Sequence, residues 1–135
     1  MDGRRIPWGS AAELDFAVAR RVRDAGQLDD AAAMLRKLGC DYPDDDTVLG
    51  ELGIVEHELG RYEDALGFLR RAQALDPSYE PWSVALFHTL CAVDRLHDAL
   101  VEAKRFMQAY PPAPGYVRLV GELHERLRGE GLLHD

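Results

Sequence analysis

Three side chains near the middle of the chain are of types that bind metals or act as nucleophiles: His57, His88 and Cys91. His88 and Cys91 are three residues apart, which on a helix places them on one face. A metal site needs three or four ligands in closed geometry, and no HExxH or CxxC pattern supplies them. Cys91 has His88 as a nearby base, but the sequence offers no orienting partner or oxyanion hole. We therefore expect no metal, no cofactor and no catalytic residue, and we predict that the protein is not an enzyme.

The remaining glycines and histidines also lack a chemical pattern. Gly50, Gly53 and Gly60 do not form a phosphate-binding loop, because they occupy positions of an internal repeat. The other histidines are expected at the protein surface, and they are His97, His124 and His134.

Composition restricts the class of protein and of partner. The chain has 135 residues, enough for one domain with its own core, and a formal net charge of −8. This acidity argues against nucleic acid and anionic membranes as partners. No apolar run approaches the ~18 residues of a membrane span, and the first residues do not resemble a signal peptide. The two cysteines, Cys40 and Cys91, are far apart, so we expect a reducing compartment and a cytoplasmic protein.

A pattern with a period of 34 residues organises most of the chain. The residues that recur at this step are Gly26 and Gly60, Leu28 and Tyr62, Ala31, Ala65 and Ala99, and Pro43, Pro77 and Pro111. Helix formers dominate, and alternating apolar and polar runs are missing, so the protein is predicted to be all-α. Self-similarity at this period is typical of a helix–turn–helix solenoid, in which neighbouring units bury each other's apolar faces.

The repeat and its punctuation predict where helices begin and end. We expect helices at 10–24, 27–40, 45–59, 61–75, 79–93, 95–109 and 114–128. Ser10 and Glu13 have capping-box spacing before the first helix. Gly60 is placed for a turn with positive φ, and Pro77 ends the following helix. Ala65 is predicted at the closest approach of two paired helices, where a small side chain is needed.

These residues resemble the tetratricopeptide repeat family. The middle unit, 46–79, matches the family pattern at Leu49, Leu52, Gly53, Gly60, Tyr62, Ala65, Leu69, Ala72 and Pro77. The first unit, 12–45, matches at Ala19, Gly26, Leu28, Ala31, Leu35 and Pro43, and the third unit, 80–113, at Leu86, Leu96, Ala99 and Pro111. The resemblance implies an all-α, right-handed α-solenoid of three helix–turn–helix units.

The chain departs from the family pattern at a few positions. Leu38 stands where the family prefers a small residue. Ala103 and Phe106 reverse the usual order of a large and then a small residue, which we interpret as a volume-conserving exchange. Phe87 replaces a small residue without a compensating change, so altered packing is expected around it.

Residues 114–128 continue the pattern weakly and are expected to form a capping helix with a polar outer face. The positions that match a first helix of the family are Val117, Val120, Gly121 and His124. The predicted organisation is a single domain at 10–130, with an N-terminal arm at 1–9 and a C-terminal tail at 131–135.

The resemblance further implies that the first helices of the units line a concave groove that binds a segment of another protein. The residues expected to line this groove are Phe16, Arg20, Arg23, Glu51, Ile54, His57, Val84, His88, Cys91, Arg118 and Glu122. Such a surface suits an extended or helical segment with apolar anchors and some acidic character. For Arg20 and Arg23, an ordinary solvated helix surface is an equally good interpretation.

The two tryptophans are expected to behave differently. Trp82 opens the third unit and is predicted to be in the core, packed against the second unit. Trp8 precedes the first helix and could fold back over the first helix pair as a hydrophobic staple, which we favour, or stay exposed as a docking anchor.

The sequence thus favours a protein–protein interaction module that acts as an adaptor or assembly factor. The family's carboxylate clamp for chaperone tails is absent, since the chain has no asparagine and both lysines, Lys37 and Lys104, lie on second helices. One alternative is a dedicated small chaperone for a secretion-system client. Another is a self-assembling structural subunit, a homodimer formed through its convex face or the region of Phe87.

Overall fold

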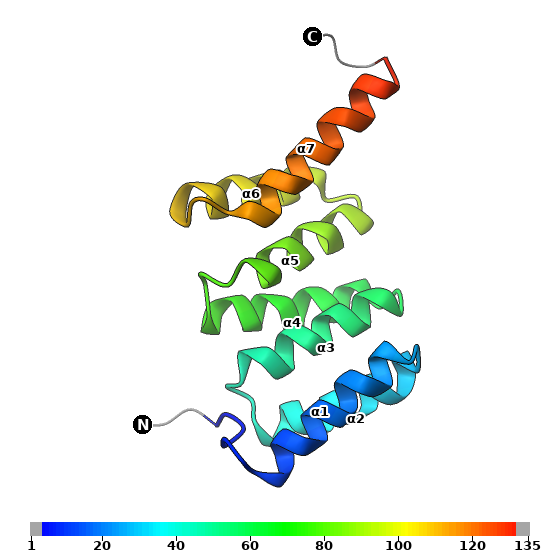
Figure 1. The fold of residues 1–135 in the computed structure, drawn as a ribbon, viewed down its shortest axis with the longest axis vertical. Coiled ribbons are helices and arrows are strands. Elements are labelled where there is room, and N and C mark those ends of the chain that lie inside the picture. The colour runs from blue at the N-terminus through cyan, green and yellow to red at the C-terminus, as the bar shows by residue number, and fades with distance from the viewer. Residues whose placement is uncertain (1–3, 132–135) are drawn as a thin grey trace.

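The computed structural model describes residues 4–131, and in this range the chain forms seven α-helices and no strand (Figure 1). The helices are α1 (Ala11–Asp24), α2 (Leu28–Asp41), α3 (Asp46–Glu58), α4 (Tyr62–Leu75), α5 (Glu80–Ala92), α6 (Leu96–Ala109) and α7 (Pro114–Gly129). Each predicted helix boundary lies within one residue of the observed one. His134 and the ends of the predicted arm and tail lie outside the described residues.

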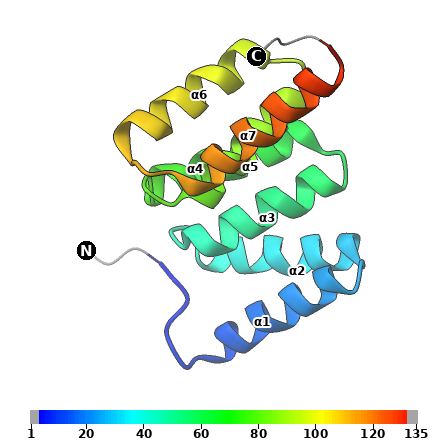
Figure 2. The ribbon, with the colours of Figure 1, turned by 45° about the horizontal axis from the view of Figure 1, so that its top comes forward.

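The helices stack in chain order as an open solenoid, as predicted (Figure 2). α1 pairs with α2, α3 with α4 and α5 with α6, and each pair packs on the next. Because α3 also contacts α5, and α5 contacts α7, these three helices form one continuous wall. None of the helices of residues 4–131 combines the length and the apolar character needed to cross a bilayer.

The turn inside each unit uses a left-handed residue. Gly26 has a φ of +83° and Gly60 a φ of +80°, which a glycine adopts without strain. The equivalent residue of the third unit is Asp94, with a φ of +60°. The third turn therefore has the same conformation as the other two, but Asp94 is strained in it because a residue with a Cβ atom is disfavoured at positive φ.

The N-terminal arm runs along the start of α3, and the staple predicted for Trp8 is wrong. The backbone N–H of Asp44 donates to the carbonyl of Arg4 (3.1 Å), and the backbone N–H of Ile6 donates to the carboxylate of Asp45 (3.0 Å). These bonds hold the arm against the α2–α3 loop and leave Trp8 94% exposed. The structure agrees with the alternative prediction, in which Trp8 is exposed.

The predicted capping box forms with one difference. The backbone N–H of Glu13 donates to the hydroxyl of Ser10 (3.3 Å), as expected. The carboxylate of Glu13 accepts from the N–H of Gly9 (2.6 Å) instead of from Ser10, whose own N–H donates to the carbonyl of Pro7 (3.2 Å). Ser10 therefore caps the start of α1, and the Glu13 carboxylate ties Gly9 of the arm to the first turn of the helix.

Trp82 is a core residue, as predicted. Its side chain is 2% exposed and packs with Leu49 and Ala72 of the second unit, and its indole N–H donates to Asp46 (3.0 Å). The ring lies directly on the backbone of Gly50, where any Cβ would overlap it. A glycine at this position is thus required by the close approach of α3 and α5.

The unusual positions of the first and third units are accommodated in the core. Ala103 and Phe106 are both buried, consistent with a volume-conserving exchange, and Leu38 is buried as well. Phe87 is half-buried, and its ring meets that of Tyr116 edge to face with centroids 6.0 Å apart. The large side chain of Phe87 therefore packs against the first turn of α7.

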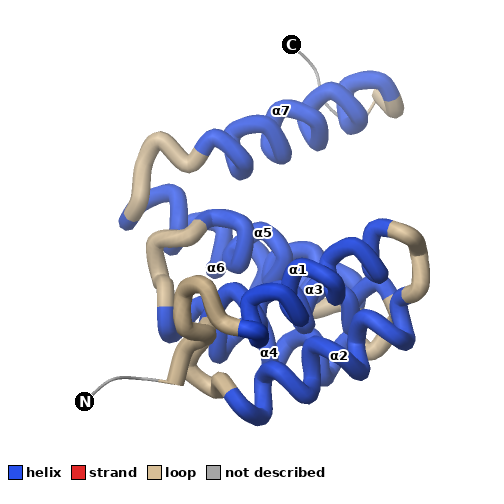
Figure 3. The backbone as a smooth tube through the Cα atoms, turned by 60° about the horizontal axis from the view of Figure 1, so that its bottom comes forward, coloured by secondary structure: helices blue, strands red, loops and turns tan. Residues whose placement is uncertain are grey.

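The capping helix does not have the polar outer face that we expected. Tyr116 is the one buried residue of α7 among those described, whereas Val117 is 61% and Val120 51% exposed. These valines occupy the positions at which a first helix of the family meets its second helix, and residues 4–131 contain no such partner. Beyond its first turn α7 runs apart from α5 and α6 (Figure 3).

Candidate protein-binding groove

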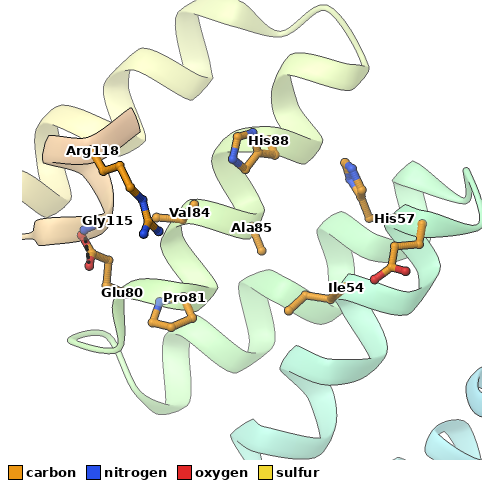
Figure 4. Close-up of a pocket in the computed structure, with 10 residues that line it drawn as sticks. Ile54, His57, Glu80, Pro81, Val84, Ala85, His88, Gly115 and Arg118 are labelled. Atoms are coloured by element: carbon orange, nitrogen blue, oxygen red, sulfur yellow. Dashed lines mark hydrogen bonds between the residues drawn. The ribbon is translucent and has the colours of Figure 1, made fainter. Parts of the chain in front are cut away.

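A cavity of about 510 Å³ opens on the wall formed by α3, α5 and α7 (Figure 4). The residues that line it are Ile54, His57, Glu58, Glu80, Pro81, Val84, Ala85, His88, Gly115 and Arg118. Five of these residues were predicted for the groove, namely Ile54, His57, Val84, His88 and Arg118. The cavity thus collects side chains from three successive units at one site.

Helical spacing explains how α5 contributes most of the lining. Pro81, Val84, Ala85 and His88 recur at three- and four-residue steps, so they share one face of α5. Ile54 of α3 faces them across the cavity (Figure 4). The floor is consequently apolar, and the polar groups stand at its two ends.

His57 is held at one end of the cavity in a defined tautomer. Its Nδ1 lies 2.9 Å from the hydroxyl oxygen of Thr89, and that hydroxyl donates to the carbonyl of Ala85 (2.8 Å). Because the single Thr89 proton is already used, the oxygen must accept from His57, so Nδ1 carries the proton. In the neutral ring Nε2 is then the acceptor that remains for a ligand.

His88 adds a second imidazole to this end of the cavity. Partial burial, and then the proximity of His57, lower the pKa of His88 below its ordinary value. His88 is therefore neutral at pH 7. His88 thus presents a hydrogen-bonding group to the cavity without adding charge to it.

The opposite end is formed by Arg118 and by the start of α7. The carboxylate of Glu80 accepts the backbone N–H groups of Gly115 (2.9 Å) and Tyr116 (3.1 Å), so its charge caps α7. Arg118 reaches over Val84 (Figure 4) and makes no hydrogen bond or ion pair with residues 4–131. A cation beside an apolar floor suits a ligand that combines an apolar side chain with a carboxylate.

The predicted residues of the first unit lie away from this cavity. The guanidinium of Arg20 is 5.8 Å from the centre of the Phe16 ring, and Phe16 lines a separate cavity of about 200 Å³ beneath the N-terminal arm. Arg23 forms ion pairs with Glu51 and with Asp24. Arg23 and Glu51 thus link the first and second units.

Cys91 and Glu122 also lie outside the cavity. They line a separate cleft of about 500 Å³ between α7 and the α5–α6 pair. Burial raises the pKa of the Cys91 thiol, which disfavours the thiolate needed for nucleophilic attack. Across residues 4–131, no three His, Cys, Asp or Glu side chains are grouped so that they could hold a metal ion.

Sequence reasoning missed half of the lining of the cavity. Pro81 and Ala85 could have been found, because they lie one helical turn from Val84 and His88 on the same face. Glu80 could not, because an acidic residue in the first turn of a helix is usually a solvated cap. Its contact with Gly115 depends on where α7 lies.

Comparison with known proteins supports the repeat assignment. A profile described as tetratricopeptide repeat matches residues 22–86. A search of curated protein sequences gave no match.

Several solved structures share the fold at low sequence identity. A crystal structure of MamA has a TM-score of 0.75 at 20% identity, covering 90% of this chain and 70% of that one. The type III secretion chaperone SycD of Yersinia enterocolitica, solved with a peptide of the translocator YopD, has a TM-score of 0.75 at 17% identity, covering 89% and 92%. The first TPR of Spaghetti (RPAP3), bound to the HSP90 peptide SRMEEVD, has a TM-score of 0.72 at 16% identity, covering 87% and 95%.

The 34-residue period, the stacked helix pairs, the matching profile and the shared fold all agree. The chain contains tetratricopeptide repeats and has the fold of tetratricopeptide-repeat proteins.

Proposed function

We propose that this protein is a non-catalytic module that binds a short segment of another protein in the cavity between α3, α5 and α7. The observation that carries the proposal is the lining of this cavity: an apolar floor, His57 and His88 at one end and the unpaired Arg118 at the other. Such a site accepts an apolar anchor residue with a carboxylate near it. The protein would act as an adaptor or assembly factor.

Two of the similar structures contain a bound peptide, which supports this assignment. SycD was solved with a YopD peptide, and Spaghetti with an HSP90 peptide. A clamp of lysines and asparagines for a terminal carboxylate is not expected here, since Lys37 and Lys104 lie on α2 and α6 and the chain has no asparagine. Recognition would rest on the apolar floor, with Arg118 as the charged contact.

A dedicated chaperone for a secreted client is the second candidate function. The similarity to SycD spans nearly the whole of both chains, 89% of this one and 92% of that one. A chaperone of this kind would keep its client soluble, whereas an adaptor would bind a partner that is soluble alone. Co-expression of the captured partner with and without this protein separates the two functions.

Site-specific photocrosslinking tests the proposed groove. A photoreactive amino acid replaces Val84 in the cavity, and in a matched variant it replaces Gly67, which is exposed on α4. We expect the Val84 variant to form a covalent adduct with one partner in the native cell, and an Ile54→Ala/His88→Ala background to lose that adduct. Equal adducts from both positions would contradict a specific groove.

A further substitution separates the cavity from the first unit. Arg20→Ala changes a residue outside the cavity that was expected to line the groove. We expect this variant to keep the adduct formed at position 84. Its loss would show that the binding surface extends over α1.

A further inference from the structure

α7 leaves an apolar cleft open against the helix pair on which it begins. The cleft measures about 500 Å³, and its apolar lining includes Phe87, Leu96 and Leu100 on one side and Leu119 and Leu123 on the other. Figure 3 shows α7 running apart from α5 and α6 over most of its length. Neither wall of this cleft is covered by another part of residues 4–131.

Both sides of α7 carry apolar side chains in contact with solvent. Leu123, which lines the cleft, is 45% exposed, and Val117 and Val120 are exposed on the other side of the helix. A helix with apolar residues on both sides is normally packed between two neighbours. In residues 4–131, α7 contacts chiefly α5, through its first turn.

A row of alternating charges runs along α7 beside the cleft. Arg118, Glu122 and Arg126 follow one another at four-residue steps along the helix, and Glu130 follows at the same step just after its end. Glu122 and Arg126 line the cleft together with Leu119 and Leu123. No ion pair or hydrogen bond within residues 4–131 engages the side chains of Arg118, Glu122 or Arg126. These charges are free for contacts with another molecule.

The charges on α7 of one copy complement those on α7 of a second copy only when the two helices are antiparallel. When two copies of α7 lie antiparallel, Glu122 faces Arg126 of the second copy and Arg126 faces Glu122. In a parallel arrangement each charge would face its own like, which is destabilising. An interface that matches itself about a two-fold axis is the usual basis of a homodimer.

We infer that α7 of a second copy of this chain packs antiparallel in the cleft. On one side of each α7, Leu119 and Leu123 face the α7 of the second copy. On its other side, each α7 faces the α6 of the second copy. Val117 and Val120 are thereby covered as well. This interface goes beyond the proposed peptide-binding function, since the cavity floor at Ile54 and Val84 takes no part in it.

Charge-reversal variants test the antiparallel arrangement. The full chain is studied by sedimentation velocity over a range of concentrations, and the wild type is expected to reach twice the mass of one chain. Glu122→Arg and Arg126→Glu each place like charges opposite one another at two points of the interface. Each single variant is expected to raise the dimer Kd by at least about tenfold.

Two combinations of these variants are expected to restore the dimer. The double variant E122R/R126E regains opposite charges at both central contacts and is expected to dimerise like the wild type. An equimolar mixture of the two single variants is expected to form a heterodimer, because the all-positive centre of one chain then faces the all-negative centre of the other. A dimer formed through any other surface would not respond in this way.

The remaining outcomes overturn the inference. A wild type that is monomeric at every concentration, single variants that dimerise normally, or a double variant that stays monomeric would each exclude the antiparallel α7 pair. Glu63→Arg makes the same charge change on α4, far from α7, and is expected to leave the dimer intact. Circular dichroism of every variant checks that its helices are retained.

Discussion

The phenol oxygen of Tyr116 lies 2.7 Å from the hydroxyl oxygen of Ser83, and this buried contact fixes the first turn of α7 on α5. The Ser83 hydroxyl donates to the carboxylate of Glu102 (2.6 Å), so its oxygen accepts the proton of Tyr116. Glu102 also accepts from Gln73 (2.5 Å) and Arg105 (2.8 Å). One connected network therefore joins α4, α5, α6 and α7.

Removing the Tyr116 hydroxyl should loosen α7 without emptying the core. In Tyr116→Phe the ring still packs on Phe106, and Ser83 still donates to Glu102. We expect a loss of about 1 kcal/mol in the free energy of unfolding at pH 7, measured by urea denaturation. A Tyr79→Phe variant, changed at an exposed tyrosine, is the control and should lose less.

The same tyrosine predicts how stability changes at alkaline pH. Burial raises the pKa of Tyr116 to about 12, whereas the unfolded chain ionises it near its ordinary value of about 10. The neutral phenol therefore stabilises the fold fully below pH 10, and this contribution is lost as the pH rises toward 12. The stability advantage of the wild type over Tyr116→Phe should shrink over this interval and then reverse, because two pKa units correspond to about 2.7 kcal/mol, more than the hydrogen bond contributes. A constant difference would contradict the raised pKa.

The hydrogen bonds of Glu102 predict that the stability of the fold decreases at acidic pH. Burial by itself would raise the pKa of Glu102, but hydrogen bonds from Arg105, Ser83 and Gln73, with the charge of Arg105, lower it. Glu102 thus stabilises the fold above its unfolded pKa, and the contribution is lost as the pH falls through the lowered value. We expect Glu102→Gln to cost about 1.5–3 kcal/mol at pH 7. Denaturation curves at decreasing pH should show the two proteins converging.

Two glycine-to-alanine substitutions should have opposite effects. A methyl group at Gly50 would overlap the ring of Trp82, so Gly50→Ala is expected to destabilise the protein by about 1–3 kcal/mol. Gly67 lies exposed in the middle of α4 with no atom near its Cβ position, and Gly67→Ala should stabilise by about 0.4–1 kcal/mol. Thermal unfolding compares the two directly, and a loss of similar size in both would contradict the close packing of Trp82.

The third turn can be improved with the residue that the first two turns use. Asp94 has a φ of +60°, and its side chain makes no hydrogen bond with the described residues. Asp94→Gly is therefore expected to raise the free energy of unfolding by up to about 1 kcal/mol. The reverse change, Gly60→Asp, should lower it by a similar amount. Chemical denaturation measures both, and an unchanged Asp94→Gly would mean that the aspartate is not strained.

The amino-acid sequence determined the secondary structure and the order of packing. Glycines and prolines at a 34-residue step limit each helix through local backbone preferences, and small residues such as Ala65 require close helix contacts. Both effects act between residues that are near in the chain or repeated along it. For this reason the helix boundaries, the buried Trp82 and the faces of α3 and α5 were predictable.

Only the tertiary structure decided what meets at the surface. The direction of α7 depends on distant contacts from Glu80 and Ser83, and that direction brings Arg118 to the cavity at Val84 but places Glu122 in a different cleft. Trp8 is exposed because two hydrogen bonds set the path of the arm: the N–H of Asp44 donates to the carbonyl of Arg4, and the N–H of Ile6 donates to the carboxylate of Asp45. Such contacts join residues that are far apart in the chain and that no local preference connects. Helical periodicity therefore predicts which residues share a face of one helix, but not which faces meet to form a cavity.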